Sequence, residues 1–178
     1  MSIKDKIFQI LNQEFREYSE WTKTTAIYDS REKAITCCLL GLGGESVELS
    51  QHMFYESGNE DLIKKEFGDI LWYVGHLVHV LGVQEKIQFL SQDESFEEIF
   101  YYIGPLQESF KKVVRDDNFV VTDEKLGKIV SHISELLSCI YQMVEASGFD
   151  FLEILELNKV KLESRLDRGV ISGSGDNR

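Results

Sequence analysis

The feature that most restricts the fold of this chain is its scarcity of proline. Pro105 is the single proline in 178 residues, whereas proline makes up about 5% of an average protein. Proline interrupts helices because it lacks a backbone N–H and its ring clashes with the preceding turn. Apolar residues recur every three or four positions along most of the chain, and no convincing strand pattern is present. The sequence therefore predicts an all-α fold, a helical bundle of about six helices.

Breaks in the helical pattern fall at residues that favour turns and caps. Gly82 and Gly148 suit the left-handed position that closes a helix, and Asp150 suits the N-cap of the last helix. Since the length suits one hydrophobic core, residues 1–178 are expected to form a single domain. The predicted helices are residues 4–26, 31–56, 60–81, 95–116 with a break at Pro105, 122–147 and 150–168.

Charge and cysteine content limit the expected partners and surroundings. The formal net charge is −12, and a surface of that sign without a basic stripe repels polymeric nucleic acid. The longest apolar run, residues 70–83, is too short to span a membrane. Cys37 and Cys38 are adjacent and Cys139 is distant, which argues against a disulfide framework. We therefore expect a cytoplasmic protein with no nucleic acid or membrane partner.

Four acidic residues form two matching pairs on the second and third predicted helices. Each pair has a spacing of three residues and lies beside an apolar stripe, at about 100° per residue. If the stripes pack together as a helical hairpin, the carboxylates converge beside the seam. Two like charges about 4 Å apart repel by roughly 4 kcal/mol at an effective dielectric near 20, so the group needs protons or a cation. The four residues are Glu45, Glu48, Glu66 and Asp69.

A ligand set made only of oxygen atoms favours Mg²⁺, with Mn²⁺ as a substitute, over zinc. A di-iron site is the nearest alternative, but it calls for Glu-x-x-His and neither pair contains a histidine. Single pairs of acids at this spacing are common on solvated helices. The prediction of a metal site therefore rests on the two pairs standing in equivalent positions.

The same residues resemble a known family. Glu45-x-x-Glu48, seventeen intervening residues and Glu66-x-x-Asp69 resemble the signature of MazG-like nucleotide pyrophosphohydrolases. These belong to the all-α NTP pyrophosphatase superfamily, which also contains all-α dimeric dUTPases. Residues 15–29 are similar to the family's N-terminal helix, and GLGGESVEL resembles its GLxGExGEL motif. The last 24 residues, LELNKVKLESRLDRGVISGSGDNR, resemble the C-terminal motif of one subgroup.

This resemblance implies Mg²⁺-dependent hydrolysis of a nucleoside triphosphate to the monophosphate and pyrophosphate. It implies that the four acids are metal ligands, and either Glu45 or Glu48 is a candidate general base. His52 follows Glu48 by one turn and is a further candidate for contact with the ligand. The residues expected to bind substrate, from the last helix, the tail and the face of the third helix, are Tyr73, Asn158, Lys161, Arg165, Asn177 and Arg178.

Residues 84–148 do not match the short members of the family. They are expected to form an inserted helical hairpin or a degenerate repeat of the acidic hairpin, with His132 and Glu135 where the third helix has Glu66 and Asp69. Long apolar stripes also predict a homo-oligomer, with a dimer as the first choice. The alternative to an enzyme is a catalytically inactive helical module of the same descent that senses nucleotides or binds a partner.

Overall fold

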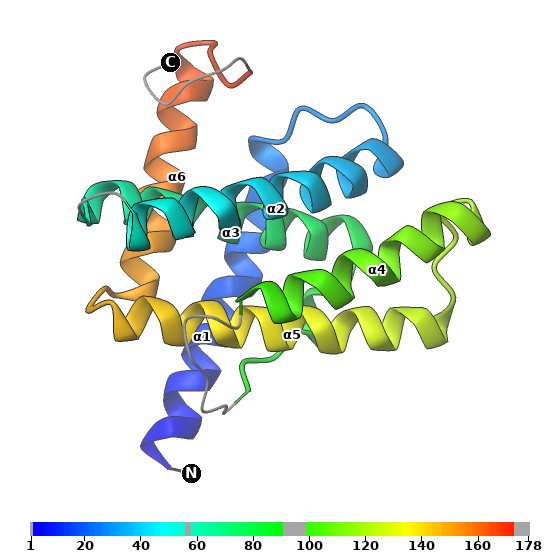
Figure 1. Cartoon of the computed structure of the whole chain (residues 1–178), viewed down its shortest axis with the longest axis horizontal. Helices are drawn as coiled ribbons and strands as arrows, with labels where there is room; N and C mark the ends of the chain where they lie inside the picture. Colours follow the sequence, from blue (N-terminus) through cyan, green and yellow to red (C-terminus); the bar gives the residue numbers. More distant parts are fainter. Residues whose placement is uncertain (1, 56–57, 91–98, 173–178) are drawn as a thin grey trace.

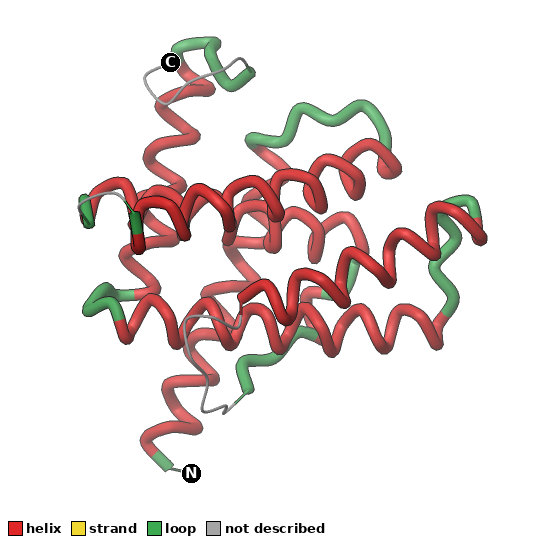
Figure 2. The backbone as a smooth tube through the Cα atoms, in the orientation of Figure 1, coloured by secondary structure: helices red, strands yellow, loops and turns green. Residues whose placement is uncertain are grey.

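The computed structural model describes residues 2–55, 58–90 and 99–172, which form helices and connecting turns without a strand among them (Figure 2). The all-α bundle predicted from the sequence is confirmed. Its six α-helices are α1 (Ile3–Trp21), α2 (Arg31–Phe54), α3 (Glu60–Leu81), α4 (Ile99–Asp117), α5 (Asp123–Ala146) and α6 (Phe151–Asp167). Two short 3₁₀ helices, η1 (Thr22–Thr24) and η2 (Gln84–Lys86), join them.

Two helical hairpins lie side by side, and α1 and α6 run across them (Figure 1). The first hairpin consists of α2 and α3, and the second consists of α4 and α5. The central element is α3, which packs against α1, α2, α5 and α6. Among the described residues, no helix is both long enough and apolar enough to cross a bilayer.

The apolar stripes predicted on α2 and α3 form the seam of the first hairpin. Ile35, Leu42 and Leu49 of α2 are at most 1% exposed, and Phe67 and Ile70 of α3 are fully buried. Each such side chain contributes roughly 1.5–3 kcal/mol when it leaves water. This seam therefore sets the register of α2 against α3, and with it the positions of the acids that flank the seam.

The first predicted helix ends earlier than expected. The α-helix stops at Trp21 and continues only as η1, because hydroxyl groups compete for the backbone there. Thr22 donates to the carbonyl of Ser19 at 2.7 Å, and Thr25 donates to the carbonyl of Thr22 at 3.2 Å. The predicted closing positions are confirmed, with φ of 67° at Gly82 and 78° at Gly148.

The predicted break at Pro105 is wrong, because α4 continues through it. Both Pro105 and Tyr101, whose carbonyl loses its usual donor, lie on the exposed side of the helix. The opposite face is held in the core by Ile103 and Leu106, which are 3% and 0% exposed. The predicted helix ends at residues 56 and 95–98 lie outside the described residues.

Residues 84–148 contain the second hairpin, as predicted. In it, α4 packs against α5, and both contact the first hairpin. Gln107 of α4 donates from Nε2 to the carbonyl of Leu39 in α2 at 2.8 Å. The second hairpin is thus part of the same core as the acidic hairpin.

A close contact between α2 and α3 depends on Gly41. A Cβ atom at this position would lie 2.2 Å from Cζ of Tyr73, whereas a Cβ at Gly44 would meet nothing within 4 Å. We expect Gly41→Ala to displace the Tyr73 ring and lower the free energy of unfolding by about 1–2 kcal/mol. Gly44→Ala should instead raise it by about 0.5–1 kcal/mol, because alanine is the better helix former. Equal changes for the two variants in urea denaturation would contradict this contact.

Candidate active site

Three of the four predicted carboxylates meet in the structure. Side-chain oxygens of Glu45, Glu48 and Glu66 all lie within 4.8 Å of one another, and we call these residues the acidic cluster. Glu66 on α3 is 3% exposed, Glu45 is half-buried and Glu48 is exposed. The cluster therefore has a buried floor and an open side from which an ion or ligand can enter.

Asp69 lies beside the acidic cluster, but α6 holds it. Lys161 Nζ lies 2.5 Å from Oδ1 of Asp69, and Asn158 donates from Nδ2 to the same oxygen at 3.0 Å. Neither contact uses the second oxygen, Oδ2. The expected convergence therefore holds for three acids, while the fourth is neutralised by a lysine from another helix. The position of α6 opposite α3 brings that cation to Asp69, and sequence spacing alone does not reveal it.

Burial and the neighbouring carboxylates alter the protonation of Glu45. Burial, then the charge of Asp69, then a hydrogen bond with Glu66 and the charges of Glu66 and Glu48 raise the pKa of Glu45 to about 8. The raised pKa lets Glu45 keep its proton to higher pH than a free carboxyl when no metal is bound, and the protonated group donates to Glu66. A proton then does what a bound cation does, which is to reduce the repulsion.

The donor set of the acidic cluster suits a hard divalent cation. It consists of three carboxylates from two adjacent helices, and oxygen donors of this kind are preferred by Mg²⁺ and Mn²⁺. His52 is close, with Nε2 at 3.6 Å from Oε1 of Glu66. The residues present therefore fit the divalent ion that the sequence led us to expect.

A pocket of about 260 Å³ adjoins the acidic cluster, and we call it the aromatic pocket. Glu45 and Asp69 form part of its wall, so the pocket opens directly onto the carboxylates. Its floor and rim combine rings, hydroxyl groups and one buried guanidinium. The lining consists of Thr25, Ile27, Tyr28, Glu45, Asp69, Trp72, Tyr73, Leu162, Arg165, Ile171 and Ser172.

The aromatic rings of this pocket differ in how firmly their contacts hold them in place. Trp72 is fixed, since its Nε1 donates to the hydroxyl of Thr25 at 2.9 Å and its ring stacks on His76. Tyr73 is half-buried and lies edge-on to Trp72, with ring centroids 5.2 Å apart. Burial, followed by the charge of Glu45, raises the pKa of Tyr73 to about 12. Its phenol therefore stays protonated and can donate a hydrogen bond.

The structure distributes the predicted substrate-binding residues over two pockets. Tyr73 and Arg165 line the aromatic pocket, and Arg165 is buried, with 6% of its surface exposed. Asn158 and Lys161 contact Asp69 and line a second pocket on the other side of that contact. Asn177 and Arg178 lie outside the described residues.

Sequence reasoning missed Tyr18, which connects α1 to the site. Its hydroxyl donates to Oδ1 of Asn158 at 2.9 Å, and this bond turns the NH₂ group of Asn158 toward Asp69. Tyr18 and Asn158 are 0% and 3% exposed. A signal was available, because Tyr18 continues the buried spacing of Leu11 and Phe15 on α1. A tyrosine hydroxyl on such a face requires a buried partner.

Comparison with known proteins finds a similarity to a phage protein. The chain is 33% identical over 75 residues to the Gene 37 protein of Mycobacterium phage L5, and the match covers 42% of this chain. The matched part is 66% of that phage protein, slightly less than two thirds. No protein-family model matches the chain. No solved structure matches it either.

The hydrogen bonds that link Tyr18 to Asp69 through Asn158 should contribute to the free energy of unfolding. Tyr18→Phe leaves the buried Oδ1 of Asn158 without its donor, and such a loss costs about 1–3 kcal/mol. Tyr141→Phe is the matched control, because Tyr141 is only half-buried and its hydroxyl makes no hydrogen bond to a described residue. Urea denaturation of both variants measures the difference. Indistinguishable midpoints would refute a stabilising role for the Tyr18 hydroxyl.

Replacing Glu45 should change how stability depends on pH. Because the pKa of Glu45 in the folded state is raised to about 8, its unfavourable contribution develops as pH rises from about 4.5 to 8 and is complete above 8. In EDTA at pH 9, we expect Glu45→Gln to raise the free energy of unfolding by about 2 kcal/mol after allowance for its partial exposure.

The same substitution should have little effect at pH 4, where Glu45 is protonated in both the folded and the unfolded state. Glu32→Gln removes an exposed carboxylate of the same helix and serves as the control. Thermal melts at both pH values measure the effect. A Glu45→Gln variant that gains nothing at pH 9 would show that the acidic cluster does not strain the metal-free fold.

Proposed function

We propose that this protein is a MazG-like, Mg²⁺-dependent nucleoside triphosphate pyrophosphohydrolase that converts an NTP or dNTP to the monophosphate and pyrophosphate. The observation that carries the proposal is the meeting of Glu45, Glu48 and Glu66 within 4.8 Å at the edge of a pocket with aromatic walls. A polyphosphate needs a cation at such a site, and a nucleobase needs a flat apolar surface. The carboxylates that would hold the cation lie beside the aromatic rings that would contact the base.

The acidic cluster would hold the metal, and Asp69 beside it would be the fourth ligand. When bound, Mg²⁺ neutralises phosphate charge and lowers the pKa of water. The metal would also remove the need for a proton on Glu45. The binding of a cation by these residues is supported by the closeness of their side-chain oxygens, and the charges of Asp69, Glu66 and Glu48 contribute, after burial, to the raised pKa of Glu45.

Other residues of the chain would orient the substrate and move the proton. Arg165 and Lys161 supply positive charge to phosphate oxygens, and Tyr73 offers a ring face and a hydroxyl donor in the aromatic pocket. In the hydrolytic step, the water oxygen bonds to the α-phosphorus as the bond to the α,β-bridging oxygen breaks. The electron pair leaves with pyrophosphate, and Glu45 or Glu48 accepts the proton from water.

One observation favours a second candidate function. Lys161 already neutralises Asp69, so one of the four acids is occupied by a cation from within the chain. A catalytically inactive module that senses nucleotides would use this arrangement to bind a nucleotide without hydrolysing it. Release of pyrophosphate separates the two functions.

The proposal also covers the oligomeric state of the protein and its cellular compartment. Leu40, Val47 and Phe54 are seven residues apart on α2 and are 71%, 50% and 59% exposed. A second copy of the chain can cover such an apolar line, which favours a homo-oligomer, with a dimer as the first choice. The free cysteines Cys37, Cys38 and Cys139 suit the reducing environment of the cytoplasm.

Pyrophosphate release over a panel of NTPs and dNTPs tests the proposal. With millimolar Mg²⁺ we expect release by the native chain from at least one nucleotide. Glu48→Gln should lower the rate by roughly 100-fold or more, because it removes a metal ligand and a candidate base. Glu32→Gln, on the same helix, should be unchanged. No release from any nucleotide, or equal release by native protein and Glu48→Gln, rejects the enzyme.

A further inference from the structure

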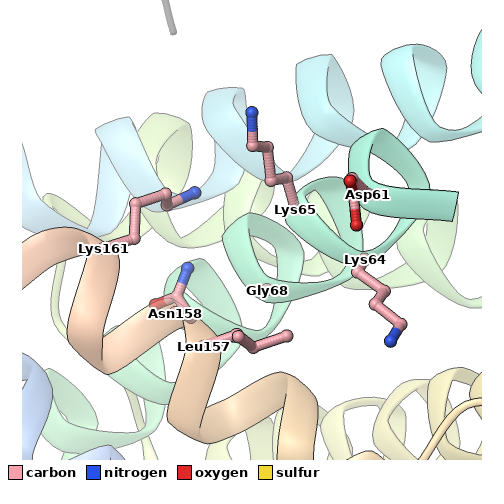
Figure 3. Close-up of a pocket in the computed structure, with 7 residues that line it drawn as sticks. All are labelled: Asp61, Lys64, Lys65, Gly68, Leu157, Asn158 and Lys161. Carbon is pink, nitrogen blue, oxygen red and sulfur yellow. The ribbon is translucent and has the colours of Figure 1, made fainter. Parts of the chain in front are cut away.

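A second pocket, of about 310 Å³, lies between α3 and α6 (Figure 3). We call it the lysine pocket, because three of its lining residues are lysines in a chain whose formal net charge is −12. At Gly68 the two helices are in close contact, since a Cβ there would lie 3.0 Å from Asn158. The remaining lining residues are Lys64, Lys65, Lys161, Asn158, Leu157 and Asp61.

Two of the three ammonium groups are held in place and the third is free to move. Lys64 lies 3.2 Å from Glu153 and 5.1 Å from the ring centroid of Phe149. Lys161 is held by Asp69 in the same way. Lys65 is exposed and makes no ion pair with a described residue. Figure 3 shows Lys65 and Lys161 on one side of the pocket and Lys64 on the other.

This lining suits a multiply charged anion and not a nucleobase. None of the residues that line the pocket is aromatic, and Leu157 is its one large apolar side chain. Ammonium groups are compact point charges that interact well with the several oxygens of a phosphate chain. The aromatic pocket, by contrast, offers Tyr28 and Tyr73 as ring surfaces. The two pockets therefore differ in the part of a nucleotide that each can hold.

The two pockets meet at one contact. Lys161 and Asn158 line the lysine pocket and bind Asp69, which lines the aromatic pocket beside Glu45. A nucleoside triphosphate laid across this contact places its base among the rings, its α-phosphate beside the carboxylates and its terminal phosphates among the lysines. The order of the chemical groups in the substrate thus matches the order of the residues.

We propose that the lysine pocket is a pyrophosphate-binding subsite, in which Lys64, Lys65 and Lys161 hold the β- and γ-phosphates of the substrate. The leaving-group role rests on the proposed function, whereas the binding of pyrophosphate does not. Negative charge grows on the bridging oxygen and the pyrophosphate as the bond to the α-phosphorus breaks. Ammonium groups at that end of the substrate stabilise this charge.

Binding of inorganic pyrophosphate in metal-free buffer tests the subsite apart from catalysis. We expect calorimetric titration to give a millimolar or tighter dissociation constant for the native chain. Lys65→Gln should weaken it by roughly tenfold. Because Lys65 forms no ion pair with any residue that the structure describes, the melting temperature of this variant should stay close to that of the native protein. Lys128→Gln removes an equal charge from an exposed site on α5 and should bind as the native chain does.

Each outcome of these binding and inhibition measurements either supports or contradicts the proposed subsite. No pyrophosphate binding by the native chain, or equal binding by Lys65→Gln, overturns the subsite, even if the protein hydrolyses nucleotides. Binding that depends on Lys65 in a protein without hydrolytic activity keeps the anion site and rejects the enzyme. If both hold, pyrophosphate should inhibit hydrolysis competitively, and Lys65→Gln should raise its inhibition constant. Activation or non-competitive inhibition would assign the pocket to a separate regulatory anion and overturn the leaving-group role.

Discussion

The contact between α2 and α3 is the interaction on which the rest of the structure depends. Burial of Leu42, Leu49, Phe67 and Ile70 draws the two helices together, and the acids at the edge of that contact must follow. The free energy gained from hydrophobic burial thereby offsets the repulsion between carboxylates whose oxygens lie within 4.8 Å of one another. The fold therefore holds carboxylates that repel one another at short distance, and a proton or a cation between them lowers that repulsion.

The structure relieves this repulsion in two ways, and both involve groups that a ligand can displace. A proton on Glu45 reduces the charge within the acidic cluster, as its raised pKa of about 8 indicates. Lys161 neutralises Asp69 from α6. A divalent ion would replace the proton, and a phosphate would compete with Asp69 for the lysine. Metal and polyphosphate should therefore favour each other's binding, because each frees a group that the other uses.

Helices that carry no acid of the cluster decide how the site is shaped. Through Asn158, Tyr18 on α1 fixes the orientation of Asp69, and α6 contributes Arg165 to one pocket and Lys161 to both sides of the contact with Asp69. The second hairpin supports α2 from behind, as in the bond from Gln107 to the carbonyl of Leu39. The second hairpin thus stabilises the acidic hairpin and adds no residue to the acidic cluster.

Much of this was determined by local sequence pattern. The lack of proline, the three- and four-residue apolar spacing, and the caps at Gly82, Gly148 and Asp150 specify helices, because they act within a few residues along the chain. The same spacing put Glu45, Glu48 and Glu66 beside one seam, since each lies on a helix whose buried face is readable from its own residues. Pro105 was misjudged because its cost depends on which face of α4 meets water, and that is set by other helices.

Only the tertiary structure decided which groups meet across helices that are distant in sequence. Asp69 and Lys161 are 92 residues apart, and Tyr18 and Asn158 are 140 apart. Their contacts depend on the crossing of α1 and α6 over α3, for which the close approach at Gly68 is one condition. The sequence determined the helices and the acidic pairs because helical periodicity is local. The partners of Asp69 and the two pockets follow from helix packing, which no single segment encodes.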